Sequence, residues 1–79
     1  MSIVFTDQRT RQDYATAGEA VAAVEAHGSG SVVKFNVTPN MPGRLPAFEY
    51  RSCAMWTYED GEWTEFGIFA GGRWAGRPE

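Results

Sequence analysis

The chain has few of the residues from which most enzyme and metal sites are built. Its 79 residues include one cysteine, Cys53, and one histidine, His27. A single cysteine excludes an intrachain disulfide, and one cysteine with one histidine cannot form a thiolate–imidazole zinc site. The acids Glu59, Asp60 and Glu62 lack the ordered oxygen spacing of a calcium loop. We therefore predict no bound metal and no cofactor.

The sequence also lacks a nucleophile beside a base, which covalent catalysis requires. We expect His27 near a helix C-terminus, where its charged form gains ~0.3–1 kcal/mol from the helix dipole. Cys53 falls on the predicted inner face of a strand, where a free cysteine serves as a small core residue. The glycines at 28–30 and 71–72 do not match a phosphate-binding loop with its lysine. We predict no catalytic residues and a protein that is not an enzyme.

Basic residues and long apolar runs are scarce as well. The chain has 7 Lys and Arg against 10 Asp and Glu, a net charge of −3, and its basic residues are scattered. Phosphate binding normally needs a basic patch, so a partner with a basic surface fits the charge better than a nucleic acid does. No run approaches the ~20 apolar residues of a membrane span, and the first residues lack a signal-peptide core. We expect a cytoplasmic protein.

Enough apolar residues are present, 43% of the chain with 14% aromatic, to predict one folded domain over residues 1–79. A β-branched run at 2–5 predicts a strand. The capping box Thr16 to Glu19 starts a predicted helix over 17–27, which Gly28 ends. Alternation over 31–38 predicts a second strand. We expect a proline-rich loop at 39–46 and a flexible tail at 76–79.

The segment after Phe48 predicts a hairpin. Asp60-Gly61 between two aromatic-rich runs is a strong turn signal, since both residues of such a turn take positive φ. A two-residue turn places Tyr58 opposite Trp63. The same register pairs Trp56 with Glu65, Thr57 with Thr64, Met55 with Phe66 and Cys53 with Ile68. A brief edge strand is expected at 73–75. The predicted fold is an α+β two-layer domain, with one helix on a mainly antiparallel sheet of about four strands in the order β-α-β-β-β.

That register divides the hairpin into two faces. One is apolar and uncharged, and we expect it to pack on the helix; it carries Cys53, Met55, Thr57, Thr64, Phe66 and Ile68. The other is aromatic with an acidic rim; its rings are Phe48, Tyr50, Trp56, Tyr58, Trp63 and Phe69. Because one helix covers one face, the aromatic face must be exposed, covered by the proline loop, or buried against another molecule.

The acidic aromatic hairpin is the candidate site. Its predicted charge contacts are Glu59, Asp60, Glu62 and Glu65, and its predicted anchors are Trp56, Tyr58 and Trp63. Rings contribute affinity through burial, and acids steer a surface toward a positive target. The alternative interpretation is a solvated charged turn, with cross-strand ring pairs that stabilise only the hairpin itself.

In these general features the chain resembles the small inhibitors encoded by phages and mobile elements, anti-CRISPR proteins in particular. The likeness is carried by 79 residues, an acidic balance, one small domain, no assembled active site and the hairpin Glu59-Asp60-Gly61-Glu62. No sequence motif defines that group, so no residue role is transferred from it. The resemblance implies a protein that acts in the cytoplasm of a bacterial host, binds a CRISPR effector subunit and blocks access to target DNA.

Two other functions are compatible with the residues. The first is a small homodimeric accessory module that pairs through the aromatic sheet face, which light scattering would detect. The second is a sheet that stacks nucleic-acid bases on its rings, at ~1–3 kcal/mol per base. The net charge of −3 and the acids beside the rings argue against the second function.

Overall fold

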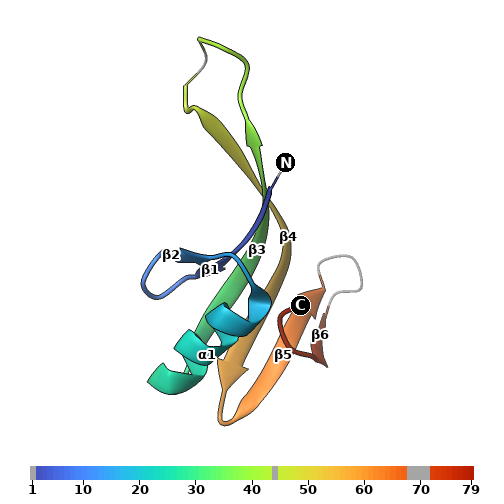
Figure 1. Ribbon diagram of the computed structural model, residues 1–79. Helices are drawn as coiled ribbons and strands as arrows, with labels where there is room; N and C mark the ends of the chain where they lie inside the picture. The colour runs from blue at the N-terminus through green and yellow to red at the C-terminus, as the bar shows by residue number, and fades with distance from the viewer. Residues whose placement is uncertain (1, 44, 68–71) are drawn as a thin grey trace.

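The computed structural model describes residues 2–43, 45–67 and 72–79 (Figure 1). Within these residues the elements are β1 (Ser2–Asp7), β2 (Gln12–Tyr14), α1 (Ala17–His27), β3 (Gly30–Pro39), β4 (Phe48–Glu59), β5 (Glu62–Gly67) and β6 (Gly72–Ala75). All neighbouring strands are antiparallel, in the order β2-β1-β3-β4-β5-β6. The predicted α+β class is confirmed, with six strands where about four were expected. No helix in the described ranges has the length and apolar character needed to cross a bilayer.

Helix α1 has the predicted bounds and both predicted caps. The amide of Glu19 donates to Oγ1 of Thr16 at 3.3 Å, and that hydroxyl donates to Oε1 of Glu19 at 3.1 Å. Gly28 takes a left-handed conformation with φ 106°, and its amide donates to the Val24 carbonyl at 3.0 Å. Glycine adopts this conformation without a Cβ clash, so it ends the helix here.

Strand β2 lies between the predicted first strand and the predicted helix, where we expected no strand. A tight turn joins it to β1: the Arg11 amide donates to the Asp7 carbonyl at 2.8 Å, and the Arg9 amide donates to Oδ1 of Asp7 at 2.9 Å. Arg11 has φ 61°, which is uncommon for a residue other than glycine, asparagine or aspartate. Sequence reasoning therefore had no turn signal from which to place β2.

The β4–β5 hairpin has the predicted turn and register. Asp60 and Gly61 have φ 52° and 78°, the positive values that a two-residue hairpin turn requires. Tyr58 is opposite Trp63, and Glu59 is opposite Glu62. The remaining predicted pairs of the described residues are also present: Trp56 with Glu65, Thr57 with Thr64, and Met55 with Phe66. The predicted partner of Cys53, Ile68, lies outside the described residues.

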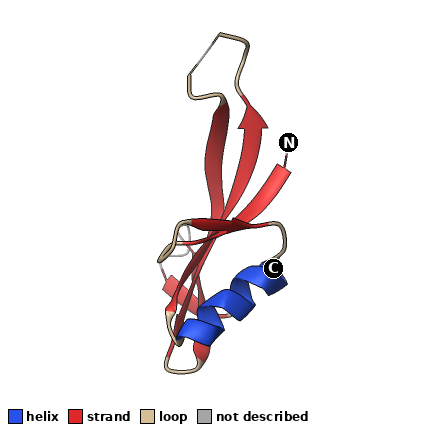
Figure 2. Cartoon of the chain, turned by 60° about the vertical axis from the view of Figure 1, so that its left-hand side comes forward, coloured by secondary structure: helices blue, strands red, loops and turns tan. Residues whose placement is uncertain are grey.

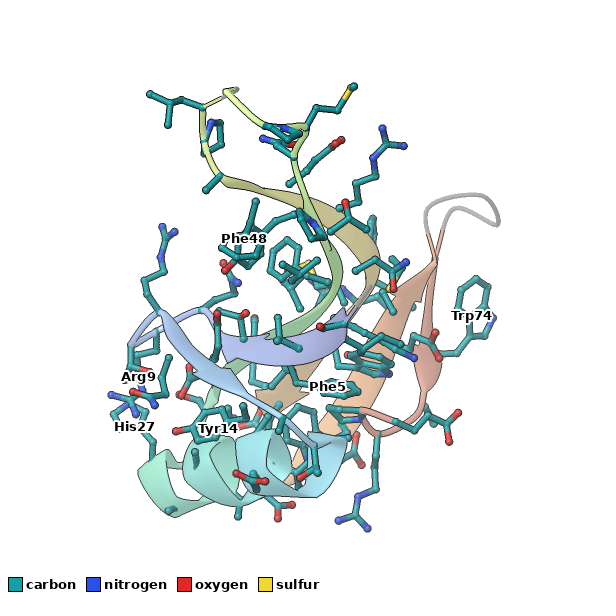
Figure 3. The ribbon with its side chains drawn as sticks, turned by 45° about the horizontal axis from the view of Figure 1, so that its top comes forward. Phe5, Arg9, Tyr14, His27, Phe48 and Trp74 are labelled. Atoms are coloured by element: carbon teal, nitrogen blue, oxygen red, sulfur yellow. The ribbon has the colours of Figure 1, made fainter. Side chains whose placement is uncertain are left out.

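The helix packs on the aromatic face of the hairpin, so our assignment of the two faces is wrong. Trp56 is 2% exposed and Trp63 is 7% exposed, and both belong to one core cluster with the helix residues Ala20, Val21 and Val24. Figure 2 shows α1 lying along one side of the sheet, and Figure 3 shows Phe5 of the same cluster on the helix side. Two indoles offer far more apolar surface for burial than the residues of the opposite face, and the small helix residues let the helix approach them.

A β-bulge in β4 corrects a second prediction. Lys34 pairs with Ala54 but Phe35 pairs with Ser52, so Cys53 is the extra residue and its side chain is exposed rather than buried. Beyond the bulge the alternation of side chains is reversed. Tyr50 therefore lies on the face opposite Trp56, where its ring meets that of Phe35 edge-on at 5.9 Å.

The same reversal moves Phe48 to the uncovered face of the sheet. Phe69, the remaining ring predicted for the aromatic face, lies outside the described residues. The uncovered face, as the name is used below, is the side of the sheet away from α1; its apolar residues are Val4, Val33, Phe35, Val37, Phe48, Tyr50, Met55 and Phe66.

Strands β3 and β4 project beyond the rest of the sheet as a twisted two-stranded arm (Figures 1 and 2). The proline-rich loop between them, described at 40–43 and 45–47, lies at the tip of the arm, close to the predicted 39–46. The tail at 76–79, which we expected to be loose, is packed instead. Pro78 is buried, the Gly76 amide donates to the Trp63 carbonyl, and Nζ of Lys34 donates to the Glu79 carbonyl at 3.1 Å.

Candidate partner-binding surface

Three carboxylates surround the turn between β4 and β5. Glu59, Asp60 and Glu62, which we call the acidic turn, are all exposed, and Glu59 lies directly opposite Glu62. Like charges in such a pair repel one another. The ion pairs found among the described residues join Arg9 to Asp7 and Arg51 to Glu49, and neither involves the acidic turn. The negative charge of the turn is therefore directed at the solvent or at a partner.

Two more acids lie on the helix side of the hairpin. Glu25, from the last turns of α1, accepts a hydrogen bond from the indole Nε1 of Trp63 at 3.1 Å. Glu65 of β5 is half-buried. Figure 1 shows the C-terminal end of α1 and the β4–β5 turn at the same end of the molecule. These two acids therefore lie on the α1 side of the sheet, whereas the paired Glu59 and Glu62 share the opposite face with Met55 and Phe66. Sequence reasoning missed the contribution of Glu25.

The three aromatic residues of the predicted site pack on the helix side of the hairpin and do not form the outer surface of the turn. Trp56 and Trp63 are core residues, so the prediction that they are exposed anchors is wrong. Tyr58 is half-buried, and its ring lies 4.9 Å from that of Trp63, tilted by 38°. This packing and the Trp63–Glu25 hydrogen bond fix the base of the hairpin. The carboxylates are consequently carried on a rigid support.

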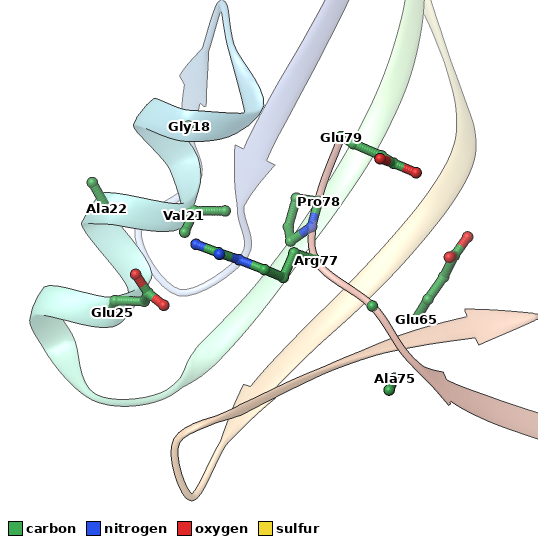
Figure 4. A pocket seen from close by; sticks show the side chains of 10 residues that line it. Gly18, Val21, Ala22, Glu25, Glu65, Ala75, Arg77, Pro78 and Glu79 are labelled. Carbon is green, nitrogen blue, oxygen red and sulfur yellow. The ribbon is translucent and has the colours of Figure 1, made fainter.

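A pocket of about 780 Å³ opens next to Glu25, between α1 and the C-terminal tail (Figure 4). Its charged lining residues are Glu25, Glu65, Arg77 and Glu79, and the others are Gly18, Val21, Ala22, Ala75, Gly76 and Pro78. In Figure 4 the Arg77 side chain extends toward Glu25 and Val21 of the helix. No local pattern could have predicted this pocket, because it depends on where the tail folds back over the sheet.

The described parts of the chain contain no group of three or more His, Cys, Asp or Glu side chains placed to hold a metal ion. No protein-family model, no curated protein and no solved structure matches the chain. Functional inference therefore rests on the geometry and charge of the surfaces described above.

Proposed function

We propose that the protein is a non-enzymatic inhibitor that binds a basic surface of another protein through the acidic turn. The observation that supports this proposal is the exposure of Glu59, Asp60 and Glu62, none of which has an ion-pair partner in the described part of the chain. Concentrated charge of one sign speeds encounter with an oppositely charged surface and discriminates against other partners.

The rigidity of the hairpin suits this role. A flexible acidic loop loses conformational entropy when it binds, whereas a preorganised one loses less. Here a two-residue turn, the Tyr58–Trp63 ring contact and the Trp63–Glu25 hydrogen bond hold the backbone that carries the carboxylates. The buried rings thus contribute to binding indirectly, by positioning the acids.

The proposed target is a protein whose basic surface normally binds nucleic acid. Such surfaces are lined by Lys and Arg that contact phosphates, and closely spaced carboxylates can occupy the positions of those phosphates. The general resemblance to anti-CRISPR proteins makes a CRISPR effector subunit the first target to test. Blocking of target-DNA access is the inhibition expected from this mode of binding.

Charge neutralisation without a change of shape tests the proposal. Substituting Glu59→Gln, Asp60→Asn and Glu62→Gln together removes three charges, and Asn tolerates the positive φ of Asp60. Affinity for purified effector subunits, measured by biolayer interferometry, should fall about tenfold or more, mainly through slower association. The DNA binding of the effector should recover in parallel.

A matched control removes the same number of charges elsewhere. Its three exposed acids lie outside the acidic turn, and its substitutions are Asp13→Asn, Glu19→Gln and Glu79→Gln. This variant should bind as the unchanged chain does. Equal losses in the two triple variants would show that only net charge matters, and no loss in either would remove the acidic turn from the binding surface.

The alternative function, a homodimeric accessory module, needs a different surface from the one we predicted. Its predicted interface included Trp56 and Trp63, which are buried. The uncovered face provides exposed rings instead, at Phe48, Tyr50 and Phe66. Exposed apolar residues grouped on one face are typical of an interaction site. A concentration-dependent mass in light scattering, together with no effect on any nucleic-acid-binding effector, would favour this alternative.

A further inference from the structure

One edge of the β3–β4 arm has unpaired backbone. Strand β4 pairs with β3 on one side from Phe48 onward, but pairs with β5 on the other side only from Met55 to Glu59. Within the described ranges no strand pairs with this second edge over residues 48–52, and every residue there is exposed. Figure 1 shows this part of β4 in the projecting arm. An unpaired strand edge can add a strand from another chain.

The sequence of this edge is complementary to itself when it runs antiparallel. If a two-fold axis passes beside Tyr50, Glu49 of one copy lies opposite Arg51 of the second copy, and the reverse pair forms on the other side of the axis. Both side chains are available: they lie on the same face of β4 and already meet within one chain, with Nε of Arg51 donating to Oε1 of Glu49 at 2.8 Å. Their side chains remain 79% and 46% exposed in that pair.

Charge selects this register over its neighbours. Moving the two-fold axis to Glu49 would place the two Glu49 side chains opposite one another, and moving it to Arg51 would do the same with the arginines. Like charges directly opposite are destabilising, and opposite charges are stabilising. Only the axis at Tyr50 makes both charged positions complementary.

The exposed rings of the arm favour the same arrangement. Phe48 and Tyr50 lie on the uncovered face, and Phe35 of β3 packs edge-on against Tyr50. Pairing about Tyr50 brings the two Tyr50 rings together across the axis, with a Phe48 on each side. The apolar surface of each arm would then continue into that of the second copy.

We propose that two copies of the chain associate edge to edge through residues 48–52 of β4, in the antiparallel register centred on Tyr50. The bulge at Cys53 interrupts the regular ladder and limits the pairing to these five residues. An interface of this length is small, so the dimer is reversible and depends on protein concentration. The inference does not depend on the proposed function, and its test needs no target protein.

Sedimentation equilibrium over a wide concentration range at low salt provides the test. The mass should rise with concentration from 8.7 kDa toward twice that value. Glu49→Arg and Arg51→Glu each place like charges opposite one another at positions 49 and 51 of the homodimer. Each substitution should weaken self-association about tenfold or more, because the two-fold axis turns one substitution into two like-charge pairs.

Mixing the two variants provides the decisive comparison. A Glu49→Arg chain presents two arginines and an Arg51→Glu chain presents two glutamates, so an equimolar mixture should form a heterodimer although neither variant self-associates. Glu59→Arg, which lies outside this edge, is the control and should dimerise normally. A monomer at every concentration would overturn the proposal. So would self-association of both single variants at the unchanged strength, with no gain on mixing.

Discussion

Both faces of the β4–β5 hairpin carry an aromatic ring or more, but only one of them is buried. On the face beneath α1, Trp56 and Trp63 are 2% and 7% exposed, whereas Phe66 on the uncovered face is 42% exposed. A single helix buries one face of a sheet. The comparison shows that the helix packs on the face with the largest rings, even though acidic residues lie one or two positions away in the sequence.

The largest expected effect is a loss of stability that depends on which face of the hairpin carries the substituted ring. Trp56→Ala should lower the free energy of unfolding by about 3–5 kcal/mol, because it leaves a large cavity in the core. Phe66→Ala should cost less than about 1.5 kcal/mol, since much of that ring is already in water. Urea denaturation followed by circular dichroism measures both. Similar losses for the two variants would contradict the assignment of the faces.

The next largest change in stability is expected from two glycine substitutions. Both Gly61 and Gly18 have open space where a Cβ would lie, but only Gly61 has a positive φ, 78°. Gly61→Ala should therefore destabilise the protein by roughly 1–2 kcal/mol. Gly18→Ala, in the first turn of α1, should stabilise it by up to about 1 kcal/mol. Thermal unfolding should shift in opposite directions, and a shift in the same direction would argue against the hairpin turn described above.

Local signals allowed much of the fold to be predicted. Thr16, Glu19 and Gly28 act through contacts within a few residues, and the helix has the bounds that they indicate. The Asp60-Gly61 turn likewise fixes the register of the hairpin by its own geometry. Such features depend on the neighbouring chain alone, so a single sequence contains what is needed to place them.

The features that we predicted wrongly depend on distant parts of the chain. The sequence alternates regularly at Tyr50, Trp56 and Tyr58 and does not indicate the bulge at Cys53. The bulge nevertheless moves Tyr50 to the other face. The packed position of Pro78 arises from contacts with segments far away in sequence. Of the acids of the candidate site, Glu59, Asp60 and Glu62 are exposed and Glu65 is half-buried. The role of the rings beside them required knowing which face the helix covers.

The smallest expected effect separates stability from binding. Glu62→Lys replaces the repulsion between Glu59 and Glu62 by an attraction, and should stabilise the protein by roughly 0.2–1 kcal/mol. The same change places a positive charge in the acidic turn and should weaken binding to a basic target. Thermal unfolding and interferometry on one preparation measure both quantities. A variant that is more stable and also binds better would indicate that the turn does not contact the target.

The most direct test of the proposed function is an NMR titration of the isotope-labelled chain with an effector subunit that retains it in a pull-down. In the bound state the amides of Glu59 to Glu62 should show the largest shifts or broadening, while the indole signal of the buried Trp56 changes little. Changes concentrated on the arm and the uncovered face, with the acidic turn unaffected, would contradict the account.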